Sequence, residues 1–375
     1  MQSLLPGSIG PVAFAGTVAV AVSSEDRGAL SWLSEYLGPW FAGTRRAADW
    51  RVRLSVASDP WALFEAGTPG AVVERACFGL DAGVVSLPAV QCRGALRIAD
   101  RERSCFFDLG PGRVELVGAA DSPRWRFSAV LILLGIIAAR MCRTSLDLHA
   151  AALDRGGRGI LVAGPKGAGK TTLATYLLGT GGCSLVANDR VFVAGPPSAP
   201  VVHGAPTPVK IRAGTLREFP ALLKDFPPLA RPYLFRREEY RSATPAPGDW
   251  RRRDVAMSPP QFLGQLGAEA RESTGADLFV LPQVHDDHPG WSLTRLSDEE
   301  LRSALRANRY GACSGRREAT VFEEIEDGSP ADSVALVESM AQCCRGYRLV
   351  LGRGAYASRA LAERLFSLAD DGGVP

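Results

Sequence analysis

One segment of the sequence, residues 159–189, carries the residue types and spacings with the clearest chemical meaning. Gly164 and Gly169 are separated by four residues, and Lys170 and Thr171 follow directly. This order fits the template of a phosphate-binding loop, in which backbone N–H groups surround phosphate oxygens and a lysine adds positive charge. The segment therefore predicts binding of a nucleoside triphosphate.

The residue types of this loop explain how it would hold phosphates. Glycines allow the backbone to curl with its N–H groups pointing inward, and the positive end of the following helix adds to the field. Lys170 would neutralise the β- and γ-phosphates, and Thr171 would supply a hydroxyl ligand to a Mg²⁺ ion between them. The predicted nucleotide-binding residues are Gly164, Pro165, Lys166, Gly167, Ala168, Gly169, Lys170, Thr171 and Thr172.

The stretches around the loop have the patterns that such a loop requires. The apolar run Ile160–Ala163 predicts a strand that enters the loop, and residues 172–178 predict a helix that leaves it. Upstream, residues 146–153 predict another strand, which is separated from the loop strand only by the Gly-rich turn 154–158. So short a connection predicts an antiparallel hairpin.

A second group of polar residues follows the predicted helix. Residues 179–182 are rich in glycine and predict its end, and Ser184–Ala187 predicts a short strand. Asn188 and Asp189 come next. If this strand is a neighbour of the loop strand, the Asp189 carboxylate lies near the γ-phosphate. The alternative is that Asp189 is a turn residue at the end of the strand.

Three further stretches hold residues with less specific chemistry. Residues 203–210 form a Pro-stiffened segment that ends in Lys210, one of four lysines in the chain. Residues 227–260 are rich in Pro, Arg and Glu, which favours an exposed charged insertion over a lid that contacts substrate. Residues 282–288 contain two histidines and two aspartates before a Pro-Gly pair, which favours an ordinary turn over a metal site.

The composition describes an ordinary globular protein. Of 375 residues, 46% are hydrophobic and 22% are charged, which suits one large or two ordinary domains. The net charge of +3 is too small to indicate nucleic acid or a membrane as a partner. The eight cysteines form no CxxC pair, which is typical of buried thiols in a reducing compartment. Because no signal-peptide pattern opens the sequence and the longest apolar run, residues 129–139, is too short to span a bilayer, we expect a cytoplasmic protein.

We predict an α/β protein with two domains. Residues 1–125 alternate short apolar runs with turns, which predicts a smaller α+β domain with an antiparallel sheet. The stretch Trp125–Cys142 has apolar residues on all sides, so we assign residues 126–145 to a buried connecting helix. Residues 146–375 form the P-loop domain. Since the first domain shows no catalytic constellation, we assign it an accessory or substrate-docking role, for instance by addition of a peptide strand to a sheet edge.

The order of features from His149 to Lys210 resembles the HPr kinase/phosphorylase family, and more closely its kinase-like relatives found beside bacterial biosynthetic operons. The resemblance is carried by His149 before the loop, the loop itself, Asp189 after the next strand, and the segment Pro206–Lys210. It covers roughly residues 146–375. It implies a P-loop kinase domain of the phosphoenolpyruvate-carboxykinase-like type.

The resemblance also implies roles for single residues. Asp189 would be the general base that takes a proton from a substrate hydroxyl, with His149 beside it, and Lys210 would face the transferred phosphate. The metal ligands would be Thr171, Asn188 and Asp189. The family usually has two acidic residues where this chain has Asn188 and Asp189, and its later Glu- and Gly-rich dephosphorylation signature has no clear counterpart here. The resemblance therefore does not extend to HPr as the substrate or to phosphorylase activity.

We therefore expect an ATP- and Mg²⁺-dependent kinase that transfers the γ-phosphoryl group to a hydroxyl, most simply a serine of a peptide or small protein made by a biosynthetic operon. GTP in place of ATP stays open, and so does a free small molecule as the acceptor. The alternative from another class is a nucleotide-dependent switch or assembly protein that docks a partner. The family is often oligomeric, so a homo-oligomer is compatible with the resemblance.

Overall fold

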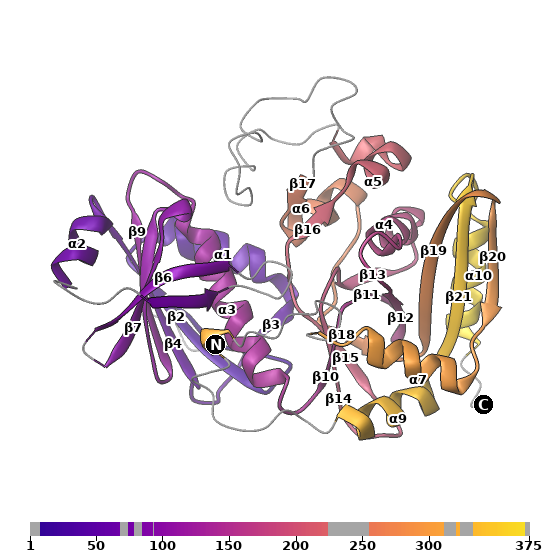
Figure 1. The fold of residues 1–375 in the computed structure, drawn as a ribbon, viewed down its shortest axis with the longest axis horizontal. Coiled ribbons are helices and arrows are strands. Elements are labelled where there is room, and N and C mark those ends of the chain that lie inside the picture. Colours follow the sequence, from indigo (N-terminus) through magenta and orange to yellow (C-terminus); the bar gives the residue numbers. More distant parts are fainter. Residues whose placement is uncertain are drawn as a thin grey trace. The chain divides into compact units, whose positions relative to one another are not determined.

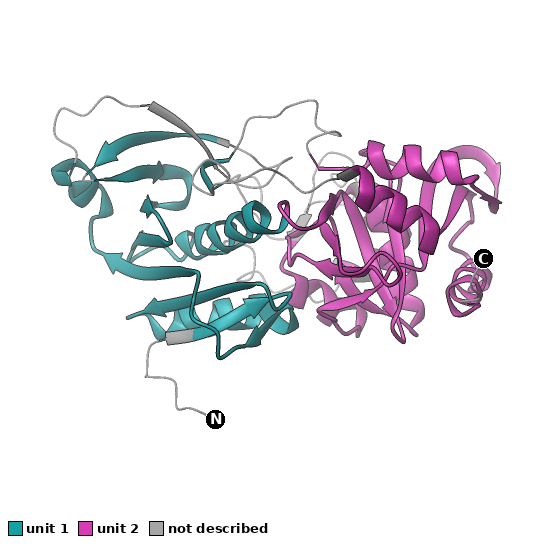
Figure 2. Ribbon diagram, turned by 90° about the horizontal axis from the view of Figure 1, so that it is seen from below, with its two compact units in different colours: residues 1–141, 227–243, 317–328 teal, residues 142–226, 244–316, 329–375 magenta. Residues whose placement is uncertain are grey.

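The structure is a computed structural model of the chain. It describes residues 8–67, 74–78, 85–92, 94–223, 255–310, 320–322 and 333–371. Helices and strands mix along the whole chain, which confirms the predicted α/β class (Figure 1). The residues form two compact units (Figure 2). Unit 1 comprises residues 1–141, 227–243 and 317–328, and unit 2 comprises residues 142–226, 244–316 and 329–375.

Unit 1 is built on a nine-stranded sheet with the order β3-β1-β2-β4-β9-β8-β7-β6-β5 (Figure 1). The prediction of an antiparallel sheet is wrong at its centre, because β4 pairs in parallel with both β2 and β9. Parallel neighbours need a crossover connection, and a helix between β2 and β4 provides one. The strands are β1 (Ser8–Phe14), β2 (Val18–Ser24), β3 (Phe41–Gly43), β4 (Trp50–Ala57), β5 (Glu74–Phe78), β6 (Val85–Cys92), β7 (Ala95–Asp100), β8 (Cys105–Gly110) and β9 (Arg113–Ala119).

The two faces of this sheet differ, as the alternation along β4 shows. Trp50 and Leu54 point to a buried face, whereas Arg51 and Arg53 between them are exposed. Two helices, α1 (Arg27–Leu37) and α3 (Trp125–Met141), pack against each other and against the central strands on the buried face. The short helix α2 (Pro60–Gly67) packs on β8 and β9. The apolar period of two in β4 therefore fixes which face forms the core.

Helix α3 (Trp125–Met141) confirms the prediction of a buried helix, and it belongs to unit 1. Nearly all of its side chains are buried, which explains why its sequence is apolar all round. Glycines make room for its neighbours: a Cβ on Gly118 would lie 2.1 Å from the indole of Trp125. A Cβ on Gly135 would lie 2.4 Å from the ring of Phe322. The core of unit 1 thus tolerates no side chain at these two positions.

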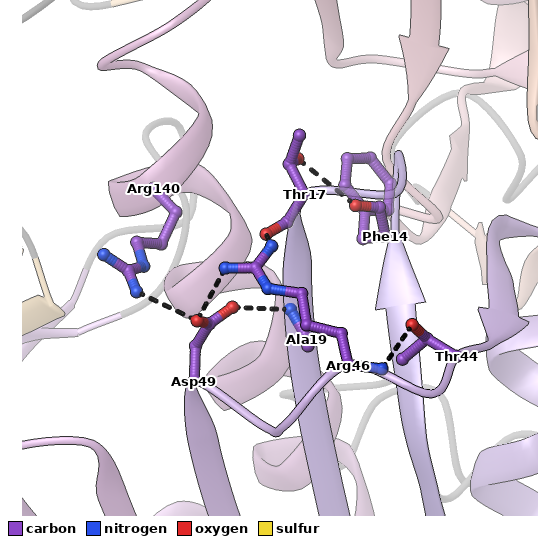
Figure 3. A network of polar contacts seen from close by, with 7 residues as sticks. All are labelled: Phe14, Thr17, Ala19, Thr44, Arg46, Asp49 and Arg140. Carbon is purple, nitrogen blue, oxygen red and sulfur yellow. Dashed lines mark hydrogen bonds and ion pairs between the residues drawn. The ribbon is translucent and has the colours of Figure 1, made fainter.

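A polar network closes the loop between β3 and β4 in unit 1 (Figure 3). Asp49 accepts hydrogen bonds from the backbone N–H of Ala19 at 2.9 Å and from the Arg46 guanidinium at 2.9 Å. Arg140, near the end of α3, lies 3.6 Å from the same carboxylate. Arg46 also donates to the carbonyl oxygen of Thr17. One half-buried carboxylate therefore joins the β1–β2 turn, the loop and the helix.

Replacing Asp49 by Ala should destabilise unit 1 by about 2 kcal/mol, because it removes hydrogen bonds that involve charged groups and leaves a backbone donor without its acceptor. The change is measured as a shift in the urea unfolding curve followed by tryptophan fluorescence. Arg53→Ala is the control: its side chain is 60% exposed and its nearest carboxylate oxygens are 3.6 and 3.8 Å away. That variant should lose less than about 0.5 kcal/mol, and equal losses in both would contradict the role given to Asp49.

The described residues of unit 2 form three sheets (Figure 1). The largest has the order β13-β11-β12-β19-β21-β20, a second has the order β10-β14-β15-β18, and β16 pairs with β17. The strands are β10 (Leu146–Leu148), β11 (Ala150–Arg155), β12 (Arg158–Ala163), β13 (Ser184–Ala187), β14 (Val191–Ala194), β15 (Val201–Gly204), β16 (Val209–Ile211), β17 (Val255–Met257), β18 (Ser273–Gly275), β19 (Leu278–Pro289), β20 (Trp291–Arg295) and β21 (Arg345–Arg353).

The helix predicted over residues 172–178 is present as α4 and extends slightly beyond that stretch at both ends. Ser297 caps its helix in a capping box with Glu300, which explains the acidic first turn. The helices are α4 (Lys170–Thr180), α5 (Ala213–Glu218), α6 (Pro259–Leu266), α7 (Asp298–Ala307), α9 (Ser333–Cys343) and α10 (Ala360–Asp370).

The predicted hairpin before the loop is confirmed. β11 and β12 pair antiparallel from Arg155↔Arg158 to Ala150↔Ala163, around a turn in which Gly156 has a φ of +60°. Almost every residue of both strands is buried, so their sequences are continuously apolar and do not alternate. The hairpin therefore forms the centre of unit 2 and delivers the chain to Gly164.

The prediction of a turn at residues 282–288 is wrong, because β19 continues through this stretch to Pro289. β19 pairs in parallel with β21 from Leu278 to Val284 and again at Pro289, so the segment between them stays within the sheet despite an irregularity in register. His288 there makes a hydrogen bond of 2.9 Å with Ser292, not with a metal-ligating partner. Among the described residues, no group of three His, Cys, Asp or Glu side chains is arranged to hold a metal ion. Most of the predicted charged insertion, residues 227–260, lies outside the described residues.

The described helices include none that is long and apolar enough to cross a membrane. This includes α3, the most apolar long helix of unit 1, which packs within that unit. The apolar run at residues 129–139 is thus explained by packing in a protein core.

Among the described residues, the cysteines at positions 92, 105, 142, 183, 343 and 344 are free thiols. Cys105 and Cys344 are buried, while Cys92, Cys142 and Cys343 are partly exposed. Burial raises the pKa of the Cys105 and Cys344 thiols well above the ordinary value. These two cysteines therefore behave as small apolar side chains, as predicted.

Candidate functional site

The strand register brings His149 and Asp189 together. Ala150 pairs with Ala163, so His149 lies level with Gly164, the first residue of the loop. On the other side of β11, Ala152 pairs with Ala187 in antiparallel sense. Because the strands are antiparallel, Asp189, two residues after Ala187, lies beside Ala150, two residues before Ala152. Both residues therefore lie at the end of these strands where the predicted loop begins.

The expectation that the strand before Asp189 is a neighbour of the loop strand is wrong. β11 lies between them, in the order β13-β11-β12. The reason is the hairpin. β11 pairs with the edge of β12 that would otherwise be open to β13, so β13 pairs with β11 instead. Because His149 immediately precedes β11, the histidine comes to lie between Asp189 and the loop strand.

The Asp189 carboxylate has one partner on each oxygen. Nε2 of His149 lies 3.0 Å from Oδ1, and the hydroxyl of Tyr310 lies 2.8 Å from Oδ2. An ionised carboxylate only accepts hydrogen bonds, so both partners donate and His149 carries its hydrogen on Nε2. The Asp189 side chain keeps 36% of its surface exposed. It is therefore held in place while still accessible.

Electrostatics keep Asp189 ionised. Burial alone would raise the pKa of its carboxyl, but the hydrogen bond and charge of His149, the hydrogen bond from Tyr310 and the charge of Lys170 outweigh it. They lower the pKa of Asp189 from 3.8 to about 2. Burial and the charge of Asp189 raise the pKa of Tyr310 well above 10, so the phenol stays a donor.

Tyr310 reaches this site because the end of α7 pairs with the chain next to His149. The backbone N–H of His149 donates to Asn308 at 2.8 Å, and the N–H of Tyr310 donates to the carbonyl oxygen of Asp147 at 3.0 Å. On the other edge of the same segment, Asp147 pairs with Phe192 of β14. β10 and His149 are therefore flanked on one side by β14, which follows Asp189, and on the other side by residues 308–310, which follow α7.

A buried ion pair stands behind Tyr310. Asp147 accepts from Nε of Arg190 at 3.1 Å and also from Nη2 of that guanidinium. The Arg190 side chain is 7% exposed and the Asp147 side chain 12%. The guanidinium carbon lies 4.2 Å from the centre of the Tyr310 ring, in cation–π contact. The pair is thus hydrogen-bonded and stacked, which compensates for its burial.

The glycines of the predicted phosphate loop adopt backbone conformations that favour glycine. Gly164, Gly167 and Gly169 have φ angles of +139°, +94° and +100°, which side chains other than glycine rarely adopt. A Cβ on Gly164 would lie 3.1 Å from the Cβ of Ala168. Nζ of Lys170 donates to the carbonyl oxygen of Gly164 at 2.6 Å. The loop therefore curls around its own lysine at the N-terminus of α4.

The residues beside the loop suit a Mg²⁺ ion by the chemistry of their donors. Thr171 offers a hydroxyl, Asn188 an amide oxygen and Asp189 a carboxylate, all oxygen ligands of the kind that Mg²⁺ prefers. Thr171 follows Lys170 in the first turn of α4 and is partly exposed. Mg²⁺ in such sites keeps water and phosphate ligands, so a cage of three carboxylates is not required.

Other predicted residues lie nearby or elsewhere in unit 2. Pro165, Lys166 and Gly167 form the exposed tip of the loop. Thr172 on α4 shares a hydrogen bond of 2.6 Å with the hydroxyl of Thr215. Lys210 lies on β16, in the two-stranded sheet that packs on α4, with its side chain exposed. The structure therefore joins His149, Asp189 and the loop in one sheet, and it assigns Lys210 to a different one.

Tyr310, Arg190 and Asp147 were not predicted to belong to the site. Tyr310 lies 121 residues after Asp189, and no motif marks it. The signal that was available is weak: Arg190 directly follows Asp189, and Asp147 stands two residues before His149. Arg190 and Asp147 flank the predicted residues Asp189 and His149. Their opposite charges indicate that they form a buried pair only once β10 and β14 are known to be neighbours.

The lowered pKa of Asp189 predicts a pH-dependent contribution to stability. Its folded pKa of about 2 lies below the unfolded value of about 3.9. The ionised carboxylate therefore stabilises the fold above the unfolded pKa, and this contribution is lost as the pH falls through the folded pKa. The urea midpoint of the parent should exceed that of Asp189→Asn near pH 6, and the difference should shrink between about pH 4 and pH 2. A difference that stays constant over this range would contradict the lowered pKa.

No protein-family model matches the sequence, and no curated protein is significantly similar to it.

Proposed function

We propose that the chain is an ATP- and Mg²⁺-dependent phosphotransferase that passes the γ-phosphoryl group to a hydroxyl acceptor, and that unit 2 is a P-loop domain of the HPr kinase-like, phosphoenolpyruvate-carboxykinase-like type. The observation that carries the proposal is the Asp189 carboxylate, ionised and held on both oxygens, at the sheet edge where the phosphate loop begins. GTP is the second candidate nucleotide.

The loop supplies the charge that phosphoryl transfer needs. Backbone N–H groups of the loop and the N-terminus of α4 would bind the phosphates, and Lys170 would add a full positive charge. Mg²⁺ bound through Thr171 and Asn188 would neutralise further phosphate charge. Because the transition state for this transfer is stabilised mainly by positioning and electrostatics, few groups beyond these are required.

Asp189 would align the acceptor. A carboxylate with a pKa of about 2 is a weak base toward an alcohol. In a loose transition state, however, the hydroxyl becomes acidic only as its oxygen bonds to the γ-phosphorus, while the bond from phosphorus to the bridging oxygen of the diphosphate breaks. Asp189 therefore orients the hydroxyl first and receives its proton late. The products are the phosphate ester, the nucleoside diphosphate and a proton passed on to solvent.

A serine of a peptide or small protein is the acceptor class that we favour. The resemblance to kinase-like relatives in biosynthetic operons supports this choice. Unit 1 supports it too, because its sheet ends in two edge strands, β3 and β5, and an edge strand can pair with an extended peptide. Lys210, exposed on β16, would meet the phosphate of the product.

Intact-mass spectrometry tests the proposal. The full chain is incubated with Mg·ATP or Mg·GTP and with small proteins and peptides encoded beside its gene, and Asp189→Asn is run in parallel. We expect a gain of one phosphate on one partner with the parent and none with the variant.

Two other outcomes have distinct meanings. Phosphate transfer to a free hydroxyl compound, but to no peptide, would keep the kinase and change its acceptor class. Nucleotide binding or slow hydrolysis without any phosphorylated product would overturn the kinase proposal in favour of a nucleotide-dependent switch or assembly protein.

A further inference from the structure

We infer that Tyr310 is a positioning residue of this site: its hydroxyl fixes the Asp189 carboxylate in the orientation that aligns the acceptor. The inference rests on the proposed function, because it names what sets the geometry of the proposed aligning group. Tyr310 belongs to none of the motifs that define the phosphate loop, and it arrives from the far end of α7.

The hydrogen bonds to Asp189 fix the orientation of its carboxylate. The Tyr310 hydroxyl holds Oδ2 at 2.8 Å and His149 holds Oδ1 at 3.0 Å. The two donors also pack against each other, with ring centres 5.5 Å apart and planes at 57°. A rotation of the carboxylate would therefore break at least one hydrogen bond to an ionised group, the stronger kind. Each oxygen keeps a second lone pair for a substrate hydroxyl.

Tyr310 is itself held without any help from substrate. Its backbone N–H donates to Asp147, and the side chain of that same residue binds Arg190. Arg190 in turn covers the Tyr310 ring at 4.2 Å. The phenol is thus fixed at its backbone and at its ring face before any ligand arrives. Preorganised donors of this kind lower the reorganisation that a reaction must otherwise accomplish.

The variant Tyr310→Phe separates this role from simple packing. Phenylalanine keeps the ring contacts with His149 and Arg190 and removes only the hydroxyl. We expect kcat to fall about tenfold, the loss caused by a less well aligned acceptor, with the KM for ATP unchanged within about twofold. In the Asp189→Asn background the same change should have no further effect, because residues that act as one unit are not additive.

Tyr176→Phe is the matched control. Tyr176 is a buried tyrosine of unit 2, and its hydroxyl is bonded to the carbonyl oxygen of Ser358 at 2.5 Å and to the N–H of Ala362 at 3.3 Å. Its loss also removes a buried hydroxyl, so it measures the cost of a general loosening of the fold. We expect kcat to stay within about twofold of the parent.

A measurement without substrate distinguishes failure of this inference from failure of the proposed function. The ¹³C resonance of the Asp189 carboxyl, assigned by its absence in Asp189→Asn, is titrated in the unliganded protein. Loss of the Tyr310 donor should raise the pKa of Asp189 in Tyr310→Phe and not in Tyr176→Phe. An unchanged titration, or an unchanged kcat, would overturn the inference. A shifted titration in a protein that phosphorylates no acceptor would overturn the proposed function and leave Tyr310 as the group that holds Asp189.

Discussion

Replacing Lys170 by Met should lower kcat/KM for phosphotransfer about 10²- to 10³-fold while the protein stays folded. Lys170 is buried with 8% of its surface exposed, and its Nζ donates to Gly164 at 2.6 Å and to Pro165 at 3.4 Å. The ammonium group therefore already lies inside the curl of the loop, where phosphate oxygens would bind. Methionine keeps the aliphatic stem and removes the charge, so most of the effect falls on phosphate binding and on the transition state.

The control for this prediction is Arg158→Met. Arg158 stands at the other end of the same loop strand, and its side chain is 48% exposed in an ion pair with Asp277 at 2.8 Å. The substitution also removes one positive charge, yet it should change kcat/KM less than about twofold because exposed pairs contribute little. Steady-state kinetics and the binding of a fluorescent ATP analogue measure both variants. Equal activity of Lys170→Met and the parent would remove the phosphate loop from the mechanism.

The parts of the site that depend on neighbouring residues were predictable from the sequence. Gly164, Gly169 and Lys170 act through backbone conformation and a helix terminus, and such properties are fixed within a few residues. The hairpin of β11 and β12 was predictable for the same reason, since two apolar runs joined by Gly156 and Gly157 have few other ways to pair.

Strand order was not predictable in the same way. The parallel centre of the unit 1 sheet and the place of β11 between β13 and β12 both depend on pairings between distant segments. Residues 282–288 contain His, Asp and Pro, and their local preference is for a turn. Pairing with β21 on both sides of residues 285–288, up to Val284 and again at Pro289, overrides that preference and keeps the stretch in the strand.

The sequence could name Asp189 and His149 but not what fixes them. Tyr310, Arg190 and Asp147 come from three separate segments, and each one alone is an unremarkable residue type. They matter through their contacts: the Tyr310 phenol binds the Asp189 carboxylate, and the Arg190 guanidinium lies against the Tyr310 ring and binds the Asp147 carboxylate. Such contacts appear only when the end of α7 and the chain after β13 meet on either side of β10.

Replacing Asp189 by Asn should lower kcat about 10²- to 10⁴-fold and leave the affinity for ATP within about threefold of the parent. Asparagine has nearly the same shape but no charge. Its carbonyl oxygen can accept one hydrogen bond from His149 or Tyr310, while its amide group must face the other donor. The aligning acceptor is therefore lost along with the group that receives the proton. The predicted phosphate loop, which would hold the nucleotide, has its own contacts and should be unaffected.

Asp370→Asn is the matched control for this prediction. The substitution is chemically the same, and Asp370 is a 47% exposed carboxylate on α10 that is paired with Arg155 at 2.8 Å. It should leave kcat within about twofold of the parent, since loss of an exposed ion pair has little effect on a distant site. Single-turnover phosphorylation with radiolabelled ATP measures the chemical step in all three proteins, and equilibrium binding measures the nucleotide. If Asp189→Asn lost ATP affinity in proportion to its rate, the carboxylate would be part of nucleotide binding and not the aligning group. If it turned over like Asp370→Asn, the acceptor would be aligned by other residues, and the low pKa of Asp189 would have only a structural meaning.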